Sequence, residues 1–561
     1  MPDIATALQQ MATADPRVRI LHTQYFYPGD ALVPSSQAAS DSSIRLANGV
    51  TLVKLYVRTA GSLPPSATPH PTAGTDVGIE LWLPNAETWN GRLRVQIQGG
   101  FMGDAGVTAA DQFAAAPCGS ELPMGQLAAD RGYVVASTDG GHVATTYEDT
   151  SYLLNADGTV NHEGFKNIAW QATRETARLS KATILAYYGR PQTYSYLFGC
   201  STGGRQAYHS AQKYPADFDG YLAGCPSLTQ SILFPSLIHP LIVVNNDLGG
   251  QPFKPGQLEM VSRKALTAGD TTVTGDHDGY ITHWDDNTYD PTKDPTVLDT
   301  ASGGTNTEPW ALSIAQARAI NKIWYGPTID GNIPDPAVDN GSHYKLSPNQ
   351  LWWGKIRGTR IDFAGRPRDI GGGWLANVFS DPAYASSLWN HPLGEAKNKW
   401  TKMTHKEFAE ALLASRARDP DFENMDADNP DLREAQRLGK KILTYHAIGD
   451  TGVAPQSSVR YYEASSAVTG GLAATQAFHR LFLIPGMGHC TRYRGVAGYV
   501  DPPMPTLEEM FDALVAWVER GEALDHLDAT SVDGKLKRRL YAYPKSPRHE
   551  GGKGAETTSK L

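Results

Sequence analysis

Long apolar runs and basic clusters are both absent from this chain of 561 residues. Without a run of 18 or more apolar residues, we expect no membrane span and no membrane partner. Without a basic cluster, and with a net charge of −9, nucleic acid is not an expected partner. The hydrophobic content of 40% fits a globular protein, and the length exceeds that of one usual hydrophobic core. The oligomeric state stays open.

Cysteine is also scarce, since the sequence has only four: Cys118, Cys200, Cys225 and Cys490. Four cysteines allow three complete pairings. Cys118 and Cys225 either pair with each other or are free thiols, and the sequence does not decide between these. The first residues carry neither the basic segment nor the apolar core of a secretory signal.

The most informative segment is residues 199–203, which read GCSTG and match the G-x-S-x-G pattern. Residues 193–198 before it favour a strand, and residues 204–211 after it favour a helix. A strand that turns sharply into a helix projects the serine hydroxyl, and flanking glycines remove Cβ clashes. The pattern predicts a nucleophile elbow with Ser201 as the attacking residue. An ordinary serine at a strand–helix turn is the alternative.

Two further residues complete a candidate catalytic set. Asp450 follows the strand-like run 442–448, and His489 follows the strand-like run 481–484 in a glycine-rich loop. The chain order Ser201, Asp450, His489 is that of α/β-hydrolases. His489 would take the serine proton, and Asp450 would orient the imidazole. A turn-forming aspartate is the alternative interpretation of Asp450.

A cysteine adjoins each of two members of this set. Cys200 precedes Ser201, and Cys490 follows His489. If Ser201 and His489 meet in a catalytic pair, the two cysteines come close as well. We therefore expect a disulfide between Cys200 and Cys490 that ties the nucleophile turn to the histidine loop.

Together these residues resemble the tannase and feruloyl esterase family, which includes the bacterial mono(hydroxyethyl) terephthalate hydrolases. The marks are GCSTGGR at residues 199–205, Asp450 after a strand, and the pair His489 and Cys490. Similar segments occur in the same order along most of the chain, from roughly residue 45 to 545. Three of them are residues 136–142, 214–220 and 516–521.

The resemblance implies a serine carboxylic ester hydrolase that works through an acyl-enzyme and needs no cofactor for catalysis. The substrate class that it implies is a small aromatic ester of the hydroxycinnamoyl, galloyl or terephthalate type. An oxyanion hole is expected from the N–H groups of Thr202 and Gly100, with Gly99 as the neighbouring candidate. A plain glycine turn at residues 98–103 is the alternative.

The resemblance also implies a structural calcium in the acidic stretch 270–281. Asp270, Asp276 and Asp278 are the expected ligands, because carboxylates suit a hard cation. The cysteines that bracket this loop in the family are absent, and Thr274 stands where an aspartate is expected. A solvated acidic loop is the alternative. A bound calcium would hold the loop in shape and take no part in chemistry.

The composition changes between the candidate catalytic residues. Residues 228–435 are rich in Trp, Pro, Gly and Asp, and we expect a lid domain there. Residues 1–227 and 436–545 are expected to form an α/β-hydrolase domain with a doubly wound, mostly parallel sheet. We expect an irregular arm before residue 45 and a disordered tail at 546–561. The tryptophans of the lid either form an acyl pocket or fill a second core.

Signals for the compartment conflict. A structural disulfide belongs in an oxidising compartment, and the resemblance favours export. We therefore expect a secreted or periplasmic protein whose signal peptide is not part of these residues. The chain ends in Ser559, Lys560 and Leu561, which spell a peroxisomal address in a eukaryote, and this is the alternative.

Two other functions could use the same scaffold. An acyltransferase, or a hydrolase of thioesters or lactones, would keep the acyl-enzyme and change the donor or the acceptor. A non-catalytic binding protein would have no need of Ser, Asp and His together. Reaction with a serine-directed phosphonate separates the binding protein from both enzymes.

Overall fold

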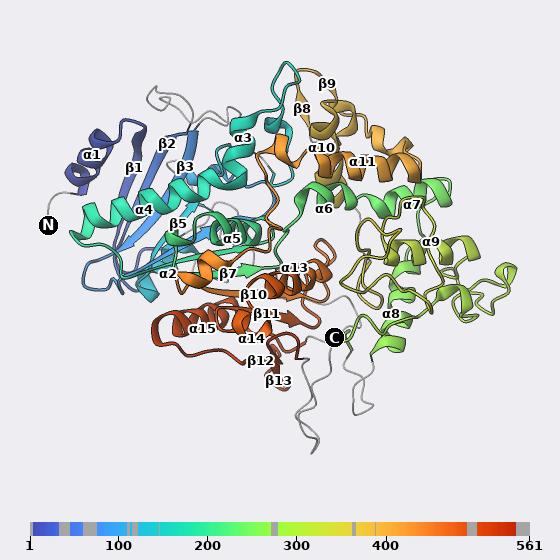
Figure 1. Ribbon diagram of the computed structural model, residues 1–561. Helices are drawn as coiled ribbons and strands as arrows, with labels where there is room; N and C mark the ends of the chain where they lie inside the picture. Colours follow the sequence, from blue (N-terminus) through green and yellow to red (C-terminus); the bar gives the residue numbers. More distant parts are fainter. Residues whose placement is uncertain are drawn as a thin grey trace.

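The computed structural model describes residues 4–32, 45–59, 76–108, 113–114, 122–144, 146–270, 279–361, 366–386, 389–490 and 502–545. Its centre is a nine-stranded sheet in the order β1-β2-β3-β5-β4-β6-β7-β10-β11 (Figure 1). The six strands from β5 to β11 are parallel, whereas β3, β2 and β1 extend one edge in antiparallel pairing. The strands are β1 Val18–Phe26, β2 Val50–Arg58, β3 Asp76–Pro84, β4 Arg92–Ile97, β5 Val134–Thr138, β6 Tyr194–Cys200, β7 Gly220–Gly224, β10 Lys441–Ala447 and β11 His479–Ile484.

Helices cover both faces of this sheet, so its central strands are short, apolar and buried throughout. Val53 and Val95 share one core with helices α4 and α5, and the neighbouring Leu52 points to the other core, with α2 and α15. These helices are α2 Met124–Arg131, α4 Ala172–Tyr188, α5 Thr202–Lys213 and α15 Leu507–Arg520. The architecture is the α/β-hydrolase fold, as predicted.

The prediction of an irregular arm before residue 45 is wrong for the part that the structure describes. Helix α1 Ile4–Ala14 packs on α4, and β1 pairs with β2 as the edge strand. Edge strands expose one face and one row of backbone groups, so the alternation of apolar residues in β1 is weak. The helical segment before β6 consists of α3 His162–Lys166, a π-helical turn Asn167–Gln171, and α4.

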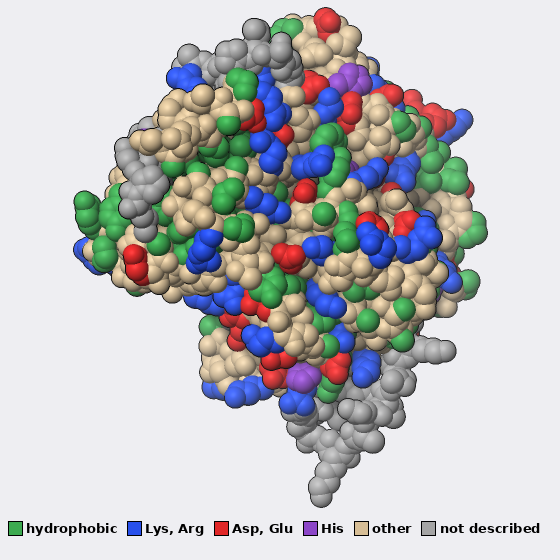
Figure 2. Space-filling model, turned by 60° about the vertical axis from the view of Figure 1, so that its left-hand side comes forward, with side chains coloured by type: hydrophobic (Ala, Val, Ile, Leu, Met, Phe, Trp, Pro, Cys, Tyr) green, Lys and Arg blue, Asp and Glu red, His purple; other side chains and the backbone are tan. Residues whose placement is uncertain are grey.

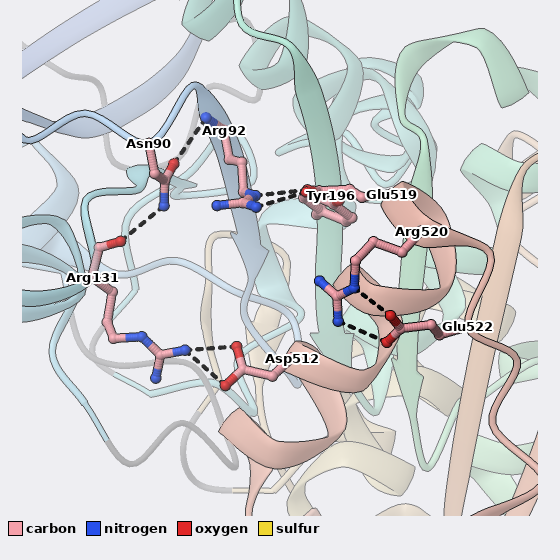
Figure 3. Close-up of polar contacts among 8 residues, drawn as sticks. All are labelled: Asn90, Arg92, Arg131, Tyr196, Asp512, Glu519, Arg520 and Glu522. Atoms are coloured by element: carbon pink, nitrogen blue, oxygen red, sulfur yellow. Dashed lines mark hydrogen bonds and ion pairs between the residues drawn. The ribbon is translucent and has the colours of Figure 1, made fainter.

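Ion pairs fasten α15 to the sheet (Figure 3). Arg92 of β4 binds Glu519 through two contacts of 2.6 Å, and the Tyr196 hydroxyl donates to the same carboxylate at 2.6 Å. Beneath them Arg94, whose side chain is fully buried, forms two hydrogen bonds of 2.8 and 2.9 Å to Glu508. Buried bidentate pairs of this kind fix geometry more than they add stability.

The segment between β7 and β10 contains helices joined by long irregular stretches and lies beside the sheet rather than on its faces (Figure 1). Its helix α10 contacts α6 and α11, and α7 contacts α9, so the segment has packing of its own. Its boundaries at 228 and 435, and its role as a lid, stay predictions. Its elements are α6 Gln230–Ser236, α7 His239–Asp247, α8 Gln257–Gly269, α9 Ile314–Tyr325, α10 Arg366–Phe379, β8 Asn390–His391, β9 Gly394–Glu395, α11 His405–Ala417 and α12 Arg433–Arg437.

The chain after β10 returns to the sheet. Its elements are α13 Pro455–Val468, α14 Leu472–Gln476, β11, α15 and the small antiparallel pair β12 His526–Thr530 and β13 Lys537–Tyr541. None of the helices in the described residues is long and apolar enough to cross a membrane. On the face drawn in Figure 2, basic and acidic side chains are interspersed, in keeping with the diffuse charge of the sequence.

Candidate active site

Ser201 occupies the sharp turn between β6 and α5, with φ 62° and ψ −119°. Its N–H donates to the carbonyl oxygen of Gly224 at 2.9 Å, which anchors the turn to β7. The two glycines of the motif leave no room for a Cβ. A Cβ on Gly199 would lie 2.4 Å from the carbonyl carbon of Gly203, and one on Gly203 would lie 2.4 Å from the carbonyl oxygen of Ile97. The segment therefore has the strand–turn–helix shape that its motif predicts.

The predicted disulfide is present. Cys200 and Cys490 are bonded, with their Cα atoms 5.9 Å apart and a sequence separation of 290. Because Cys200 directly precedes Ser201 and Cys490 directly follows His489, the bond holds the nucleophile turn against the histidine loop. Both cysteines are buried.

Cys225 answers part of the question that the sequence left open. It is a free, buried thiol, so it does not pair with Cys118, which lies outside the described residues. Its Sγ atom and the two sulfurs of the disulfide lie within 4.8 Å of one another. Burial, together with the nearby charge of Asp450, raises the pKa of Cys225 well above its usual value.

Asp450 and His489 meet because strand pairing continues past the ends of β10 and β11. The N–H of Ile448 donates to Ile484 at 2.9 Å, and the N–H of Gly449 donates to Met487 at 2.9 Å. This brings Asp450 beside the loop that carries His489. The Nδ1 atom of His489 lies 2.6 Å from Oδ2 of Asp450.

The other oxygen of this carboxylate is held by the backbone. Oδ1 of Asp450 accepts hydrogen bonds from the N–H groups of Gly452 at 2.7 Å and Val453 at 2.8 Å. The Asp450 side chain is fully buried, whereas that of His489 is 31% exposed. The Asp450 carboxylate is therefore fixed in place, while the partly exposed imidazole of His489 can still reach solvent or substrate.

Charge pairing sets the protonation states of the two side chains. Burial alone would raise the pKa of Asp450, but the charge and hydrogen bond of His489, together with the nearby N–H of His446, hold that pKa far below its usual value. Removal from water lowers the pKa of His489, but Asp450 overcomes this and raises it above the ordinary value. Asp450 is thus an anion that makes His489 a stronger base.

Three backbone N–H groups near Ser201 have no hydrogen-bond acceptor among the described residues. Those of Thr202, Gly99 and Gly100 make no hydrogen bond within the described part of the chain. Thr202 begins α5, and a Cβ on Gly99 would lie only 3.6 Å from Cβ of Ser201. Gly100 has φ 57°, and a Cβ there would lie 2.5 Å from the carbonyl oxygen of Tyr147. The roles of these amides in an oxyanion hole stay predictions.

A cavity adjoins the turn that follows Asp450, and sequence reasoning did not single out His239 and Lys355 of its lining. The inserted segment lines one side of it with His239, Trp352, Trp353 and Lys355. The Lys355 ammonium donates to the carbonyl oxygen of Thr451, so the insertion is attached to the catalytic turn.

Most of the insertion's described tryptophans are core residues, and their role in an acyl pocket stays a prediction. Trp352 and Trp353 line this cavity, 4.8 Å apart between ring centroids. Both also belong to the same buried core as Trp374, whereas Trp324 lies in a second core. Trp374 packs on Phe101, which follows Gly100, so the core of the insertion also supports the glycine loop.

The calcium site stays a prediction. Asp276 and Asp278 lie outside the described residues. Asp270 ends α8 and is buried, and its Oδ2 atom accepts a hydrogen bond from the N–H of Gly279 at 2.7 Å. This contact joins the two described residues on either side of 271–278. Within the described residues, Asp270 belongs to no group of three His, Cys, Asp or Glu ligand atoms.

Comparison with known proteins agrees with this geometry. The sequence profile of a family described as tannase and feruloyl esterase matches residues 66–560. A probable feruloyl esterase of Arthroderma benhamiae is 29% identical over 491 residues, which cover 86% of this chain and 82% of the relative. A mono(2-hydroxyethyl) terephthalate hydrolase of Piscinibacter sakaiensis is 25% identical, covering 86% and 81%.

The fold matches solved structures over almost the whole chain. The crystal structure of feruloyl esterase B from Aspergillus oryzae superposes with a TM-score of 0.73 at 21% identity, covering 99% of both chains. The family match spans most of the sequence and includes all three candidate catalytic residues. The chain therefore belongs to the tannase and feruloyl esterase family and is a carboxylic ester hydrolase.

Proposed function

We propose that this enzyme hydrolyses esters of aromatic carboxylic acids, with Ser201 as nucleophile, His489 as base and Asp450 as its orienting anion. The single observation that carries the residue assignment is the 2.6 Å contact between His489 Nδ1 and Asp450 Oδ2. The disulfide supports it, because it ties that histidine to the nucleophile turn. The names of the relatives, feruloyl esterase and mono(2-hydroxyethyl) terephthalate hydrolase, support the aromatic acyl group.

The reaction follows from these positions. Asp450 holds the Nδ1–H of His489, which leaves Nε2 as a proton acceptor. Ser201 Oγ attacks the ester carbonyl carbon while its proton passes to Nε2. The tetrahedral intermediate then expels the alcohol oxygen, which takes that proton from His489. The product of this half-reaction is an acyl ester of Ser201.

Deacylation repeats the steps with water. His489 removes a proton from water as its oxygen attacks the acyl carbon, and Ser201 recovers its proton when the carboxylic acid leaves. The negative oxygen of each intermediate would accept hydrogen bonds from Thr202 and from Gly99 or Gly100. Loss of one such donor typically costs about 10²–10³ in rate.

A release assay tests this proposal. Ethyl ferulate, methyl gallate and mono(2-hydroxyethyl) terephthalate would be offered to the wild type and to Ser201→Ala. Turnover of at least one ester by the wild type, lost in the variant, supports both the residue assignment and the acyl class. If none of them is turned over while a phosphonate still labels Ser201, the result contradicts the proposed aromatic acyl group and supports Ser201 as the nucleophile.

Acyl transfer and thioester or lactone hydrolysis are the alternative reactions of the same acyl-enzyme. Adding an alcohol or thiol acceptor to the assay separates them, because a transferase forms the new ester or thioester in preference to the free acid. Exclusive formation of free acid in the presence of acceptor supports hydrolysis.

We also propose that the protein is exported to an oxidising compartment. The support is the buried disulfide beside the catalytic residues, since such bonds persist outside reducing compartments. Cell fractionation of the natural host tests it. Recovery in peroxisomes, as the terminal Ser559, Lys560 and Leu561 would direct, contradicts it.

A further inference from the structure

A second histidine lies behind the carboxylate of Asp450. His446 is the sixth residue of β10, and its side chain is fully buried. Its Nε2 atom lies 3.1 Å from the carbonyl oxygen of Val453 and 3.6 Å from Oδ2 of Asp450. Its Nδ1 atom lies 2.7 Å from Oγ of Ser458, a buried residue on α13.

These neighbours fix the tautomer of the ring. A carbonyl and a carboxylate both only accept, so the Nε2 atom of His446 must carry the proton that faces them. In the neutral ring, Nδ1 is then an acceptor, and Ser458 donates its hydroxyl hydrogen to it. One N–H bond thus points at the turn between Asp450 and Val453, with its dipole facing the carboxylate.

The hydrogen bonds of the turn from Asp450 to Val453 link Asp450, Val453 and His446 to one another. Val453 donates its N–H to Oδ1 of Asp450 at 2.8 Å, and its carbonyl oxygen accepts from His446. The remaining oxygen of Asp450, Oδ2, lies between two imidazoles, at 2.6 Å from His489 and 3.6 Å from His446. If the ring of His446 were lost, Val453 would have a buried carbonyl without its donor, and the carboxylate could turn away from His489.

We infer that His446 is a positioning residue, which holds the Asp450 turn so that Oδ2 faces Nδ1 of His489. This inference rests on the proposed roles of Ser201, His489 and Asp450. His446 is too deep in the fold to touch the substrate and acts only through Asp450. Cys225, whose Sγ lies within 4.8 Å of the nearest atoms of both His446 and Asp450, fills the remaining side of the cluster.

The test compares two substitutions. His446→Leu removes the N–H but keeps much of the volume, whereas His446→Gln can place a side-chain N–H near the position of Nε2. Active sites are counted by stoichiometric phosphonate labelling, so that kcat refers to folded, competent enzyme only. We expect His446→Leu to lower kcat per labelled site by about 10- to 100-fold, the effect expected when a buried carbonyl in this turn loses its hydrogen-bond donor. KM should change by less than about twofold, because no substrate contact is lost.

Rescue and a matched control decide the outcome. His446→Gln should recover most of the lost kcat. His479 of β11 is an equally buried histidine that contacts Tyr208 and Thr444 instead of Asp450. His479→Leu should lower the unfolding temperature without lowering kcat per labelled site.

Two results would overturn the inference: an unchanged kcat per labelled site in His446→Leu, or a Gln variant as slow as the Leu variant. Failure of the wild type to be labelled at Ser201 would instead contradict the proposed nucleophile, so the two failures are distinguishable.

Discussion

The disulfide beside the active site offers the most quantitative prediction. Replacing Cys200 and Cys490 together by alanine opens a loop of 290 residues. Chain-entropy arguments give a stabilisation of about 5–6 kcal/mol for a loop of that length, and measured disulfides typically contribute about 2–4 kcal/mol. We expect the double variant to lose about 3–5 kcal/mol. If the predicted hydrolase domain unfolds as one unit of about 300 residues, that loss lowers its unfolding midpoint by about 5–8 °C.

Both cysteines must be replaced, because Cys225 lies close by. Its Sγ and the two sulfurs of the disulfide are within 4.8 Å of one another. After a single substitution the remaining cysteine could bond to Cys225 and conceal the loss. Two variants are the matched controls. Cys225→Ala alone shows the effect of losing the buried thiol while the disulfide is intact, and the triple alanine variant shows it when the disulfide is absent.

Calorimetry and the release assay measure the consequence. The double variant should melt lower and should also turn over more slowly, because the bond fixes the Ser201 turn against the His489 loop. A midpoint within about 1 °C of the wild type, together with unchanged turnover, would refute the reasoning that the bond stabilises the catalytic arrangement.

Four further predictions follow from the same geometry. Asp450→Asn should lower kcat by about 10⁴, because an amide keeps the shape but loses the charge and favours the wrong tautomer of His489; active-site labelling before kinetics excludes unfolding, and a loss below tenfold would contradict the role. The acid limb of kcat/KM should have its midpoint above the ordinary histidine value of about 6.5, because Asp450 raises the pKa of His489 and the base works only when neutral; a midpoint below 6.5 would contradict the pairing. Gly203→Ala should slow phosphonate labelling of Ser201 and cost about 1–3 kcal/mol of stability, since its Cβ would lie 2.4 Å from a backbone oxygen. If calcium binds at residues 270–281, a chelator should lower the unfolding midpoint and added calcium restore it, with kcat unchanged, whereas no shift supports the solvated acidic loop.

Local signals in the sequence were enough for the centre of the fold and the elbow. The glycines at 199 and 203 predicted a turn in which no Cβ fits, and the structure has that turn at Ser201. The strand-like runs 193–198, 442–448 and 481–484 predicted the buried parallel strands β6, β10 and β11. The disulfide could be predicted on the condition that Ser201 and His489 meet in a catalytic pair, because a cysteine adjoins each of them.

What sequence reasoning missed depends on contacts between distant segments. Nothing near His446 in sequence marks it, because its environment comes from the packing of α13 on β10 and from the turn after Asp450. Trp352, Trp353 and Trp374 share one buried core, and composition alone could not show that the first two also line the cavity. The first strand was missed because an edge strand shows only a weak pattern.

The most direct test of the account is a labelling experiment with an aryl phosphonate, read by intact mass and peptide mapping. The account predicts one adduct per chain, located on Ser201, absent in Ser201→Ala and formed much more slowly in Asp450→Asn. An active enzyme that takes up no label, or a label on any other residue, would contradict the assignment of Ser201 as the nucleophile.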